Sequence, residues 1–165
     1  MLKWLSLPLL ALAAFSVLLP GAARAQAVIH PLGQAGSWSV VEQSPAVKAG
    51  PASCIIVNPA AAVGIRFLDG SIGLMVANAH WDLPVAMRAT LRLRIGTYSA
   101  AFQAIRVSAN RALAPMDAAA LSSLLNAMTQ GPSMVLTLFP GMPVRLRLDG
   151  FTTVLPAFRR CAGLG

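Results

Sequence analysis

One short segment, His80-Trp81-Asp82, holds the polar groups from which a hydrolase site could be built. A histidine can act as a general base, and a carboxylate can orient it. Such a pair also needs a nucleophile, and the sequence has no Gly-x-Ser-x-Gly motif that would present a serine. The other histidine, His30, lies in a polar lead-in. We therefore predict no catalytic residue, and keep a hydrolase built around His80 and Asp82 as an alternative.

The five carboxylates of the chain give little support to acid–base catalysis. Asp69 precedes a glycine in a turn, Asp117 can cap a helix, and Asp149 follows a strand. A glycosidase-like pair would have to come from Glu42 and Asp82, and nothing in the sequence brings these two together. A zinc site would need three or four ligands, and a disulfide would use both thiols. We predict no cofactor and no metal site.

Arginines on two alternating segments are the most suggestive feature of the sequence. The alternation over residues 87–95 puts Arg88, Arg92 and Arg94 on one face of a predicted strand. Arg145 and Arg147 share a face of another predicted strand. If both strands belong to one sheet, their outer faces form a guanidinium patch suited to sulfate, phosphate or carboxylate. The alternative is that outward strand positions must be polar and this chain fills them with Arg.

The first 25 residues have the order of features that a secretory signal peptide needs. Lys3 precedes an apolar run over residues 5–19, Pro20-Gly21 breaks the run, and Ala23-Arg24-Ala25 supplies small residues at the −3 and −1 positions. We expect cleavage after Ala25 and a periplasmic or secreted product. An uncleaved membrane anchor is the alternative, although the apolar run is short for a span of about 20 residues.

Cleavage would leave 140 of the 165 residues, which is the length of one domain. Two of the 13 basic residues leave with the leader, so 11 remain against 5 acidic ones and the net charge falls from +8 to +6. Such a balance favours anionic partners. In an exported protein we expect an anionic envelope component or an acidic protein, no nucleic acid, and no stable membrane insertion after the leader is removed. The sequence leaves the oligomeric state open.

Two cysteines, Cys54 and Cys161, are the only thiols of the chain. An even number of cysteines in an exported protein predicts a disulfide, and only one pairing is available within the chain. A closed loop of this length would stabilise the fold by about 3–5 kcal/mol in the chain-entropy model. Two buried free thiols are the alternative.

Short apolar or alternating segments between Pro/Gly turns predict a mainly β domain. Residues 26–36 are expected to be an extended lead-in, poorly ordered until Trp38, and residues 37–165 a single β-rich domain. About seven or eight strands fit a small β-sandwich or an open barrel with a helix packed on one end. The predicted strands cover residues 38–42, 54–57, 63–68, 71–77, 87–95, 98–107, 134–139 and 144–148.

An apolar stripe at positions i, i+3, i+4 and i+7 predicts one amphipathic helix over about residues 117–129. Asp117 can cap this helix and Gly131-Pro132 can stop it. A short C-terminal helix follows Gly150, with Thr152 as its expected cap and Pro156 in its first turn. The stripe consists of Leu121, Leu124, Leu125 and Met128.

Three short motifs follow the leader: Gly36-Ser37-Trp38, the apolar run from Cys54 to Val57, and the Leu-Asp-Gly-Phe-Thr segment from Leu148 to Thr152. Together they resemble the invasion-associated locus B family of bacterial periplasmic proteins. That family usually has a cysteine just after the tryptophan strand, where this chain has Val40-Val41-Glu42-Gln43, so its disulfide pattern does not carry over. The resemblance implies a non-enzymatic envelope protein with a β-rich fold, and it supplies no catalytic residues.

These features together predict an exported, non-enzymatic envelope protein that serves as a binding or structural module for an envelope partner. One alternative is an inhibitor-like protein that sets its arginine-bearing strand face against an acidic partner. The other is the hydrolase built around His80 and Asp82. The residues expected to bind an anion are Arg88, Arg92, Arg94, Arg145 and Arg147.

Overall fold

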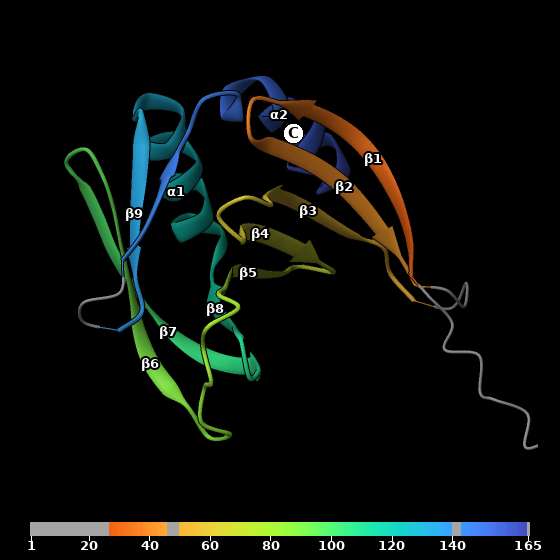
Figure 1. The fold of residues 1–165 in the computed structure, drawn as a ribbon. Coiled ribbons are helices and arrows are strands. Elements are labelled where there is room, and N and C mark those ends of the chain that lie inside the picture. The colour runs from red at the N-terminus through yellow and green to blue at the C-terminus, as the bar shows by residue number, and fades with distance from the viewer. Residues whose placement is uncertain (1–26, 46–49, 140–142, 165) are drawn as a thin grey trace, which may run out of the picture.

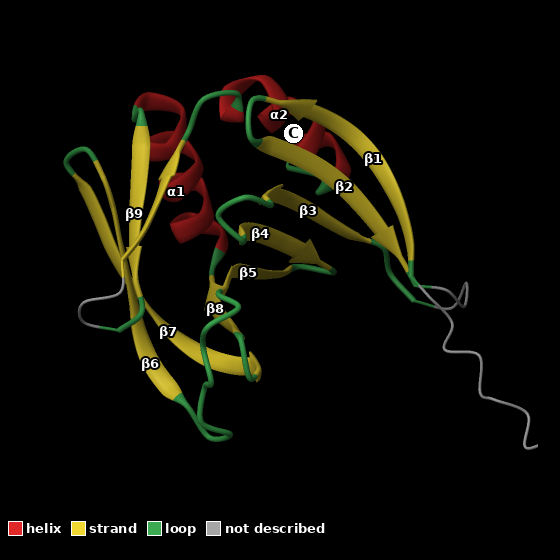
Figure 2. Cartoon of the chain, viewed as in Figure 1, coloured by secondary structure: helices red, strands yellow, loops and turns green. Residues whose placement is uncertain are grey.

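The structure, a computed structural model, describes residues 27–45, 50–139 and 143–164 of the chain. These residues form ten strands and two helices (Figures 1 and 2). The prediction of a mainly β fold is therefore confirmed, with more strands than the seven or eight expected. The predicted leader, residues 1–25, lies outside the described residues. Neither described helix could cross a bilayer, since one has 13 residues and the other 11.

The strands form one open antiparallel sheet in the order β1-β2-β3-β4-β5-β8-β7-β6-β9-β10, with β1 and β10 at its edges. A single sheet does not confirm the predicted sandwich of two sheets. The strands are β1 (Val28–Ala35), β2 (Trp38–Ser44), β3 (Ser53–Asn58), β4 (Val63–Leu68), β5 (Ser71–Ala77), β6 (Arg88–Ile95), β7 (Tyr98–Ser108), β8 (Arg111–Met116), β9 (Ser133–Thr137) and β10 (Pro143–Arg147); the helices are α1 (Ala118–Gln130) and α2 (Phe151–Cys161).

Strand β1 corrects the prediction of a poorly ordered lead-in that precedes the domain. It pairs with β2 along its whole length, and the register shifts between Pro31 and Gly33. Proline lacks the N–H that a ladder needs, so it is tolerated in an edge strand or at a bulge, and β1 provides both. Pro31 and Gly33 hid this strand from the sequence pattern, and the sheet begins before residue 37.

Strand β8 is the other strand that the sequence pattern missed. Its sequence, RALAPM, has little β-branched or aromatic character, yet it lies inside the sheet between β5 and β7. Ala112 and Ala114 are fully buried on the inner face, and Pro115 lies opposite Gly73 of β5. The two neighbouring strands supply this conformation, and local propensity does not.

The inner face of the sheet packs on both helices and forms the core. Figure 1 shows α1 between β9 and the part of the sheet that holds β3 to β5, while α2 lies by β1 and β2. Helix α2 contacts β1, β2 and β3, and it also contacts α1. The largest fully buried side chains come from strands β2 to β6 and β9 and from both helices. They are Trp38, Ile56, Ile65, Leu74, Leu91, Leu121, Leu124, Met128, Met134, Leu136, Phe151 and Phe158.

Helix α1 has the cap and the buried stripe that the sequence predicts. The side chain of Asp117 accepts a hydrogen bond from the N–H of Ala120 at 2.7 Å, which satisfies one of the free donors at the helix start. The N–H of Gly131 donates to the carbonyl of Ala127 at the other end. The four stripe residues are all buried.

Helix α2 begins and caps differently from the prediction. Its first residue is Phe151, its N-cap is Gly150 with a φ of 84°, and no side chain caps it, so Thr152 is not the cap. Pro156 lies inside the helix and not in its first turn. The side chains of Phe151, Val154, Leu155 and Phe158 are buried, and this packing outweighs the hydrogen bond that Pro156 cannot make.

Gly36, in the turn between β1 and β2, packs closely against Gly150 and Asp149, in the segment between β10 and α2. A Cβ on Gly150 would clash with the carbonyl oxygen of Ala35 and would lie 2.7 Å from the nitrogen of Gly36. A Cβ on Gly36 would lie 2.5 Å from the carbonyl oxygen of Asp149. Both glycines have a positive φ, which disfavours other residues. The turn between β1 and β2 is thereby pressed against the segment between β10 and α2.

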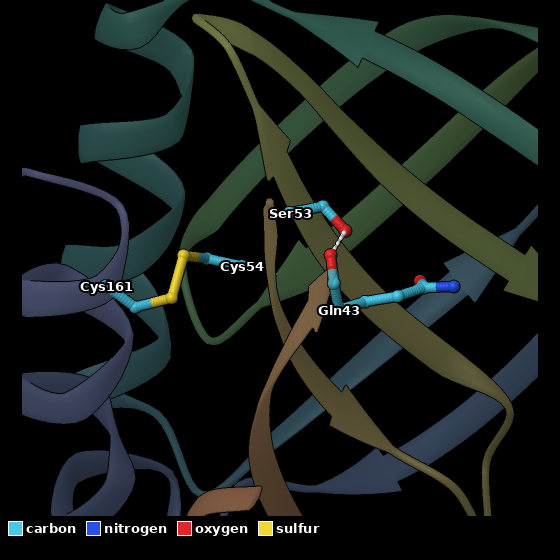
Figure 3. The surroundings of a disulfide bond; sticks show 4 residues. All are labelled: Gln43, Ser53, Cys54 and Cys161. Atoms are coloured by element: carbon cyan, nitrogen blue, oxygen red, sulfur yellow. Dashed lines mark hydrogen bonds between the residues drawn. A yellow bond between two sulfur atoms is a disulfide. The ribbon is translucent and has the colours of Figure 1, made fainter. Parts of the chain in front are cut away.

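The predicted disulfide is present between Cys54 on β3 and Cys161 at the end of α2 (Figure 3). Their Cα atoms are 5.8 Å apart, and the bond joins residues separated by 107 positions in the chain. Beside it, the hydroxyl of Ser53 donates to the carbonyl of Gln43 on β2. The disulfide ties the last helix to the strands that it covers.

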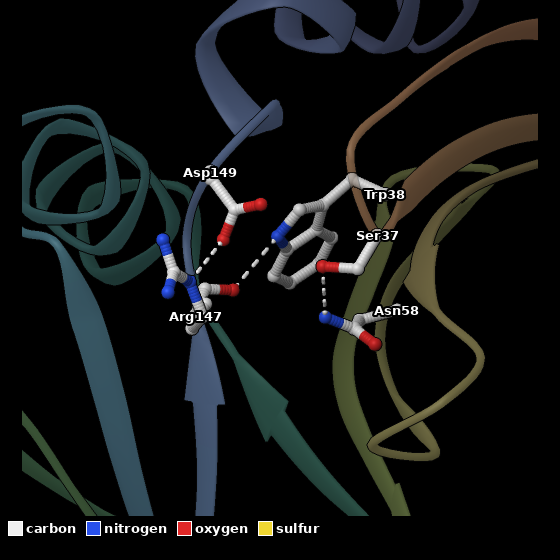
Figure 4. Close-up of polar contacts among 5 residues, drawn as sticks. All are labelled: Ser37, Trp38, Asn58, Arg147 and Asp149. Carbon is white, nitrogen blue, oxygen red and sulfur yellow. Dashed lines mark hydrogen bonds and ion pairs between the residues drawn. The ribbon is translucent and has the colours of Figure 1, made fainter.

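The two described tryptophans, Trp38 and Trp81, are buried in different polar surroundings. Trp38 is fully buried, packs edge-on against Phe151 with ring centres 5.1 Å apart, and donates its indole N–H to the carbonyl of Arg147 (Figure 4). Trp81 packs edge-on against Phe139 at 6.2 Å, but its indole N–H has no hydrogen-bond partner among the described residues.

Replacing Trp38 by Phe should therefore destabilise the fold more than replacing Trp81 by Phe. The first change leaves the carbonyl of Arg147 unpaired and should lower the free energy of unfolding by about 2–3 kcal/mol. The second removes volume and an unsatisfied donor, so we expect a loss of about 1 kcal/mol or less. Urea denaturation of both variants measures the difference, and equal losses would remove the structural role given to the Trp38 hydrogen bond.

Candidate anion-binding face

The two arginine-bearing strands lie in the same sheet, with β9 between them. Strand β6 pairs with β9, and β9 pairs with β10. The registers place Arg94 and Arg145 on either side of Val135 in one row across three strands. The condition on which the predicted guanidinium patch depended is therefore met.

The arginines point away from the core because β6 alternates. Leu91, Leu93 and Ile95 are buried on the inner face, while Arg92 and Arg94 are exposed on the outer face. Residues two apart on a strand are separated by about 6.6 Å, and residues two strands apart by about 9.5 Å. The guanidinium groups of Arg92, Arg94 and Arg145 can therefore act on neighbouring anionic groups of one partner.

The other two predicted arginines are placed differently. The Nε atom of Arg147 lies 2.9 Å from Oδ1 of Asp149, which is the only ion pair within the described ranges (Figure 4). Arg88 lies at the far end of β6, opposite Ile105 of β7, four residues from Arg92. We therefore define the arginine face as Arg92, Arg94 and Arg145, with Arg147 at its margin.

Two hollows adjoin one another on the arginine face and share Val135. The larger has a volume of about 540 Å³ and is lined by Arg92, Arg94, Ser99 and Thr137 among others. The smaller has a volume of about 270 Å³ and is lined by Arg145, Arg147 and the β9 side chains beside them. The guanidinium groups thus border concave surface that also offers hydroxyl groups.

No carboxylate neutralises the arginine face from within the described strands. The outward positions of β6, β9 and β10 hold arginines and uncharged residues alone. The five carboxylates of the chain lie elsewhere: Glu42 on β2, Asp69 in the β4–β5 turn, Asp82 before β6, Asp117 at the start of α1 and Asp149 before α2. Neighbouring positively charged side chains repel each other, and an anionic partner would relieve that repulsion.

The segment His80-Trp81-Asp82 lies in the loop between β5 and β6. Trp81 is buried, whereas His80 and Asp82 on either side of it are exposed. The backbone N–H of His80 donates to the side chain of Asn78. Among the hydrogen bonds of the described residues there is none between His80 and Asp82 and none from either to a serine. The geometry of this loop offers the hydrolase alternative no supporting contact.

His30 lies on β1 directly opposite Glu42 of β2, a pairing that the sequence pattern did not predict. His30 is exposed and Glu42 half-buried. Within residues 27–45, 50–139 and 143–164, no group of three or more His, Cys, Asp or Glu side chains is placed to hold a metal ion.

Two further arginines, which the sequence pattern did not single out, lie on the outer face of the sheet on β4 and β8. Arg66 of β4 lies opposite Ile55 and Gly73, and Arg111 of β8 lies opposite Ala77. Both outward positions follow from the buried neighbours Ile65 and Ala112. The sequence pattern that could have located these arginines is the alternation of polar and apolar residues along a strand. This alternation is weak in β4, and in β8 the buried positions are alanines, which do not stand out as apolar.

No protein-family model, no curated protein and no solved structure matches this chain. A function must therefore be argued from the site itself, since a fold alone does not determine one.

Proposed function

We propose that this protein is an exported, non-enzymatic binding module that holds an anionic envelope partner on its arginine face. The main support is that Arg92, Arg94 and Arg145 project from the same face of one sheet, on strands β6 and β10 with β9 between them, and that no carboxylate lies on the outward positions around them. Guanidinium forks bind sulfate, phosphate and carboxylate groups with two parallel hydrogen bonds.

The spacing of these arginines favours a partner with repeated anionic groups, such as an acidic polysaccharide. The backbone positions of these arginines are separated by about 6.6 Å along β6 and by about 9.5 Å across β9. A chain with an acidic group on successive units can therefore contact several arginines at once, and the second and later contacts benefit from a high effective concentration. An acidic protein is the alternative partner, and it corresponds to the inhibitor-like function.

Export is part of the proposal, and the disulfide is compatible with it. Disulfides such as the one between Cys54 and Cys161 form and persist mostly in oxidising compartments such as the periplasm or the cell exterior. The signal peptide that would direct the chain there is predicted from residues 1–25. Mass spectrometry of protein from the envelope fraction should find a chain that begins at Gln26, and a chain that retains Met1 would contradict cleavage.

Neutralising two residues of the arginine face should weaken binding to an acidic polysaccharide. We expect Arg94→Gln/Arg145→Gln to elute from immobilised heparin at clearly lower salt and to bind heparin roughly tenfold more weakly in solution. The matched control is Arg159→Gln/Arg160→Gln, which removes the same charge from the exposed side of α2. Raising the salt concentration should weaken the wild type most.

Two results would count against this function. If both double variants lose heparin binding equally, the interaction depends on net charge and no arginine face is needed. If the wild type ignores heparin but Arg94→Gln/Arg145→Gln loses an acidic protein that the wild type captures from envelope extract, the partner is a protein and the inhibitor-like alternative takes its place.

A further inference from the structure

A third hollow lies on the outer face of the sheet, over β2 to β5 and away from the arginine face. It has a volume of about 460 Å³, which falls in the range of sites for small molecules. Its lining is mostly apolar and includes Val41, Ile55, Val57 and Met75 from neighbouring strands. These side chains are half-buried although they point away from the core.

The hollow exists because a glycine occupies the centre of its floor. Gly64 of β4 stands between Val57 of β3 and Met75 of β5 in one row across the sheet. A Cβ on Gly64 would lie 3.1 Å from the carbonyl oxygen of Ile56 and 3.3 Å from the side chain of Val57. Because Gly64 carries no side chain, the floor of the hollow between Val57 and Met75 is formed by backbone.

Two arginines border this apolar floor on opposite sides. Arg66 follows Gly64 by two residues on β4, and Arg111 begins β8 opposite Ala77 of β5. Met75 lies two residues from Ala77 and directly opposite Gly64, so the row through Gly64 and Met75 runs between the backbone positions of the two arginines. The lining of the hollow contains no carboxylate.

We propose that this hollow binds an amphiphilic anion, a molecule with one alkyl chain and one acidic head group. The alkyl chain would cover Val57, Gly64 and Met75 and remove their apolar surface from water. Arg66 or Arg111 would bind the carboxylate or phosphate of the head group through its planar fork. The inference is independent of the arginine face, because the two sites share no residue.

Decanoate, used below its micelle-forming concentration, is the probe for this site. We expect it to bind the mature protein with one molecule per chain by calorimetry and to shift the methyl resonance of Met75. Decyltrimethylammonium has a ten-carbon alkyl chain with a cationic head group, and acetate has the carboxylate without the alkyl chain. Both should bind at least roughly tenfold more weakly than decanoate. Decyl phosphate tests whether the guanidinium groups of Arg66 and Arg111 prefer phosphate to carboxylate.

Two variants test separately the contact with the alkyl chain of decanoate and the contact with its carboxylate. Arg66→Gln/Arg111→Gln should weaken decanoate binding roughly tenfold or more, whereas Arg159→Gln/Arg160→Gln, with the same loss of charge, should leave it unchanged. Ala77→Phe fills the lining of the hollow without changing the charge, and it should block decanoate while leaving heparin binding intact. Circular dichroism confirms that each variant is folded.

Several outcomes would overturn the proposal. Equal binding of decanoate and decyltrimethylammonium would show that the arginines do not select the head group. Binding that survives Ala77→Phe, or an unmoved Met75 resonance, would place decanoate elsewhere. A wild-type chain that sediments as a dimer, and that becomes monomeric on Ala77→Phe, would identify a second copy as the occupant of the hollow. Failure of heparin binding bears only on the arginine face.

Discussion

Replacing Gly150 by Ala is expected to lower the free energy of unfolding by about 2–5 kcal/mol. Gly150 has a φ of 84°, and a left-handed conformation costs a non-glycine residue about 1–2 kcal/mol. The new Cβ would also meet backbone atoms of Ala35 and Gly36, which cannot move aside as a flexible side chain would. Overpacking of this kind typically adds about 1–3 kcal/mol. Urea denaturation followed by circular dichroism measures the loss.

Gly70 supplies the matched control for this substitution. It has a similar φ of 75°, in the turn between β4 and β5, but a Cβ there would have no atom within 4 Å. Gly70→Ala should therefore show the conformational cost alone, about 1–2 kcal/mol. If Gly150→Ala costs no more than Gly70→Ala, the β1–β2 turn does not pack tightly against the segment between β10 and α2.

Removing the disulfide should have an effect of similar size. The double variant Cys54→Ala/Cys161→Ala opens a link between residues 107 positions apart, and the chain-entropy model assigns such a link about 4–5 kcal/mol. The unfolded chain should also become more expanded, so the denaturant dependence of the free energy should steepen. Denaturation of wild type and variant, each with and without dithiothreitol, measures both quantities.

The reducing agent provides the control within the same experiment. Dithiothreitol should bring the wild type close to the double variant and should leave the variant unchanged, because the variant has no cysteine. Protection of α2 against hydrogen exchange should fall most, since the bond joins the end of this helix to β3. An unreduced wild type no more stable than the variant would contradict the role given to the disulfide.

Local signals in the sequence predicted those elements that local interactions determine. Asp117 and the stripe after it located α1 to within one residue at each end, because capping and helical periodicity depend on a few neighbouring positions. The alternation of β6 likewise predicted which side chains face the core. The disulfide followed from there being only two cysteines in the chain.

Features that depend on distant partners could not be predicted in this way. Strands β1 and β8 carry prolines and small residues, and their conformation is supplied by pairing with β2, β5 and β7. Alternation in one segment tells which face a side chain occupies, but it does not tell which strand lies beside it. The row from Arg94 through Val135 to Arg145 needed the pairing of β9 with both neighbours.

Two of the five arginines predicted to bind an anion lie outside the arginine face. Arg88 shares a face with Arg92 and Arg94, as alternation predicted, but it lies at the other end of β6. Arg147 shares a face with Arg145, yet Asp149 pairs with it two residues later. Candidate site residues can therefore be assigned to a face from sequence, while their grouping and their neutralisation require the fold.

An anionic partner is expected to contact the arginine face and not the other arginines of the surface. Nuclear magnetic resonance of the arginine Nε–Hε groups during titration with a short heparin oligosaccharide tests it most directly. The resonances of Arg92, Arg94 and Arg145 should move together and saturate at one stoichiometry, while those of Arg159 and Arg160 on α2 stay in place. Movement of the α2 resonances with no change at the three strand arginines would contradict the claim.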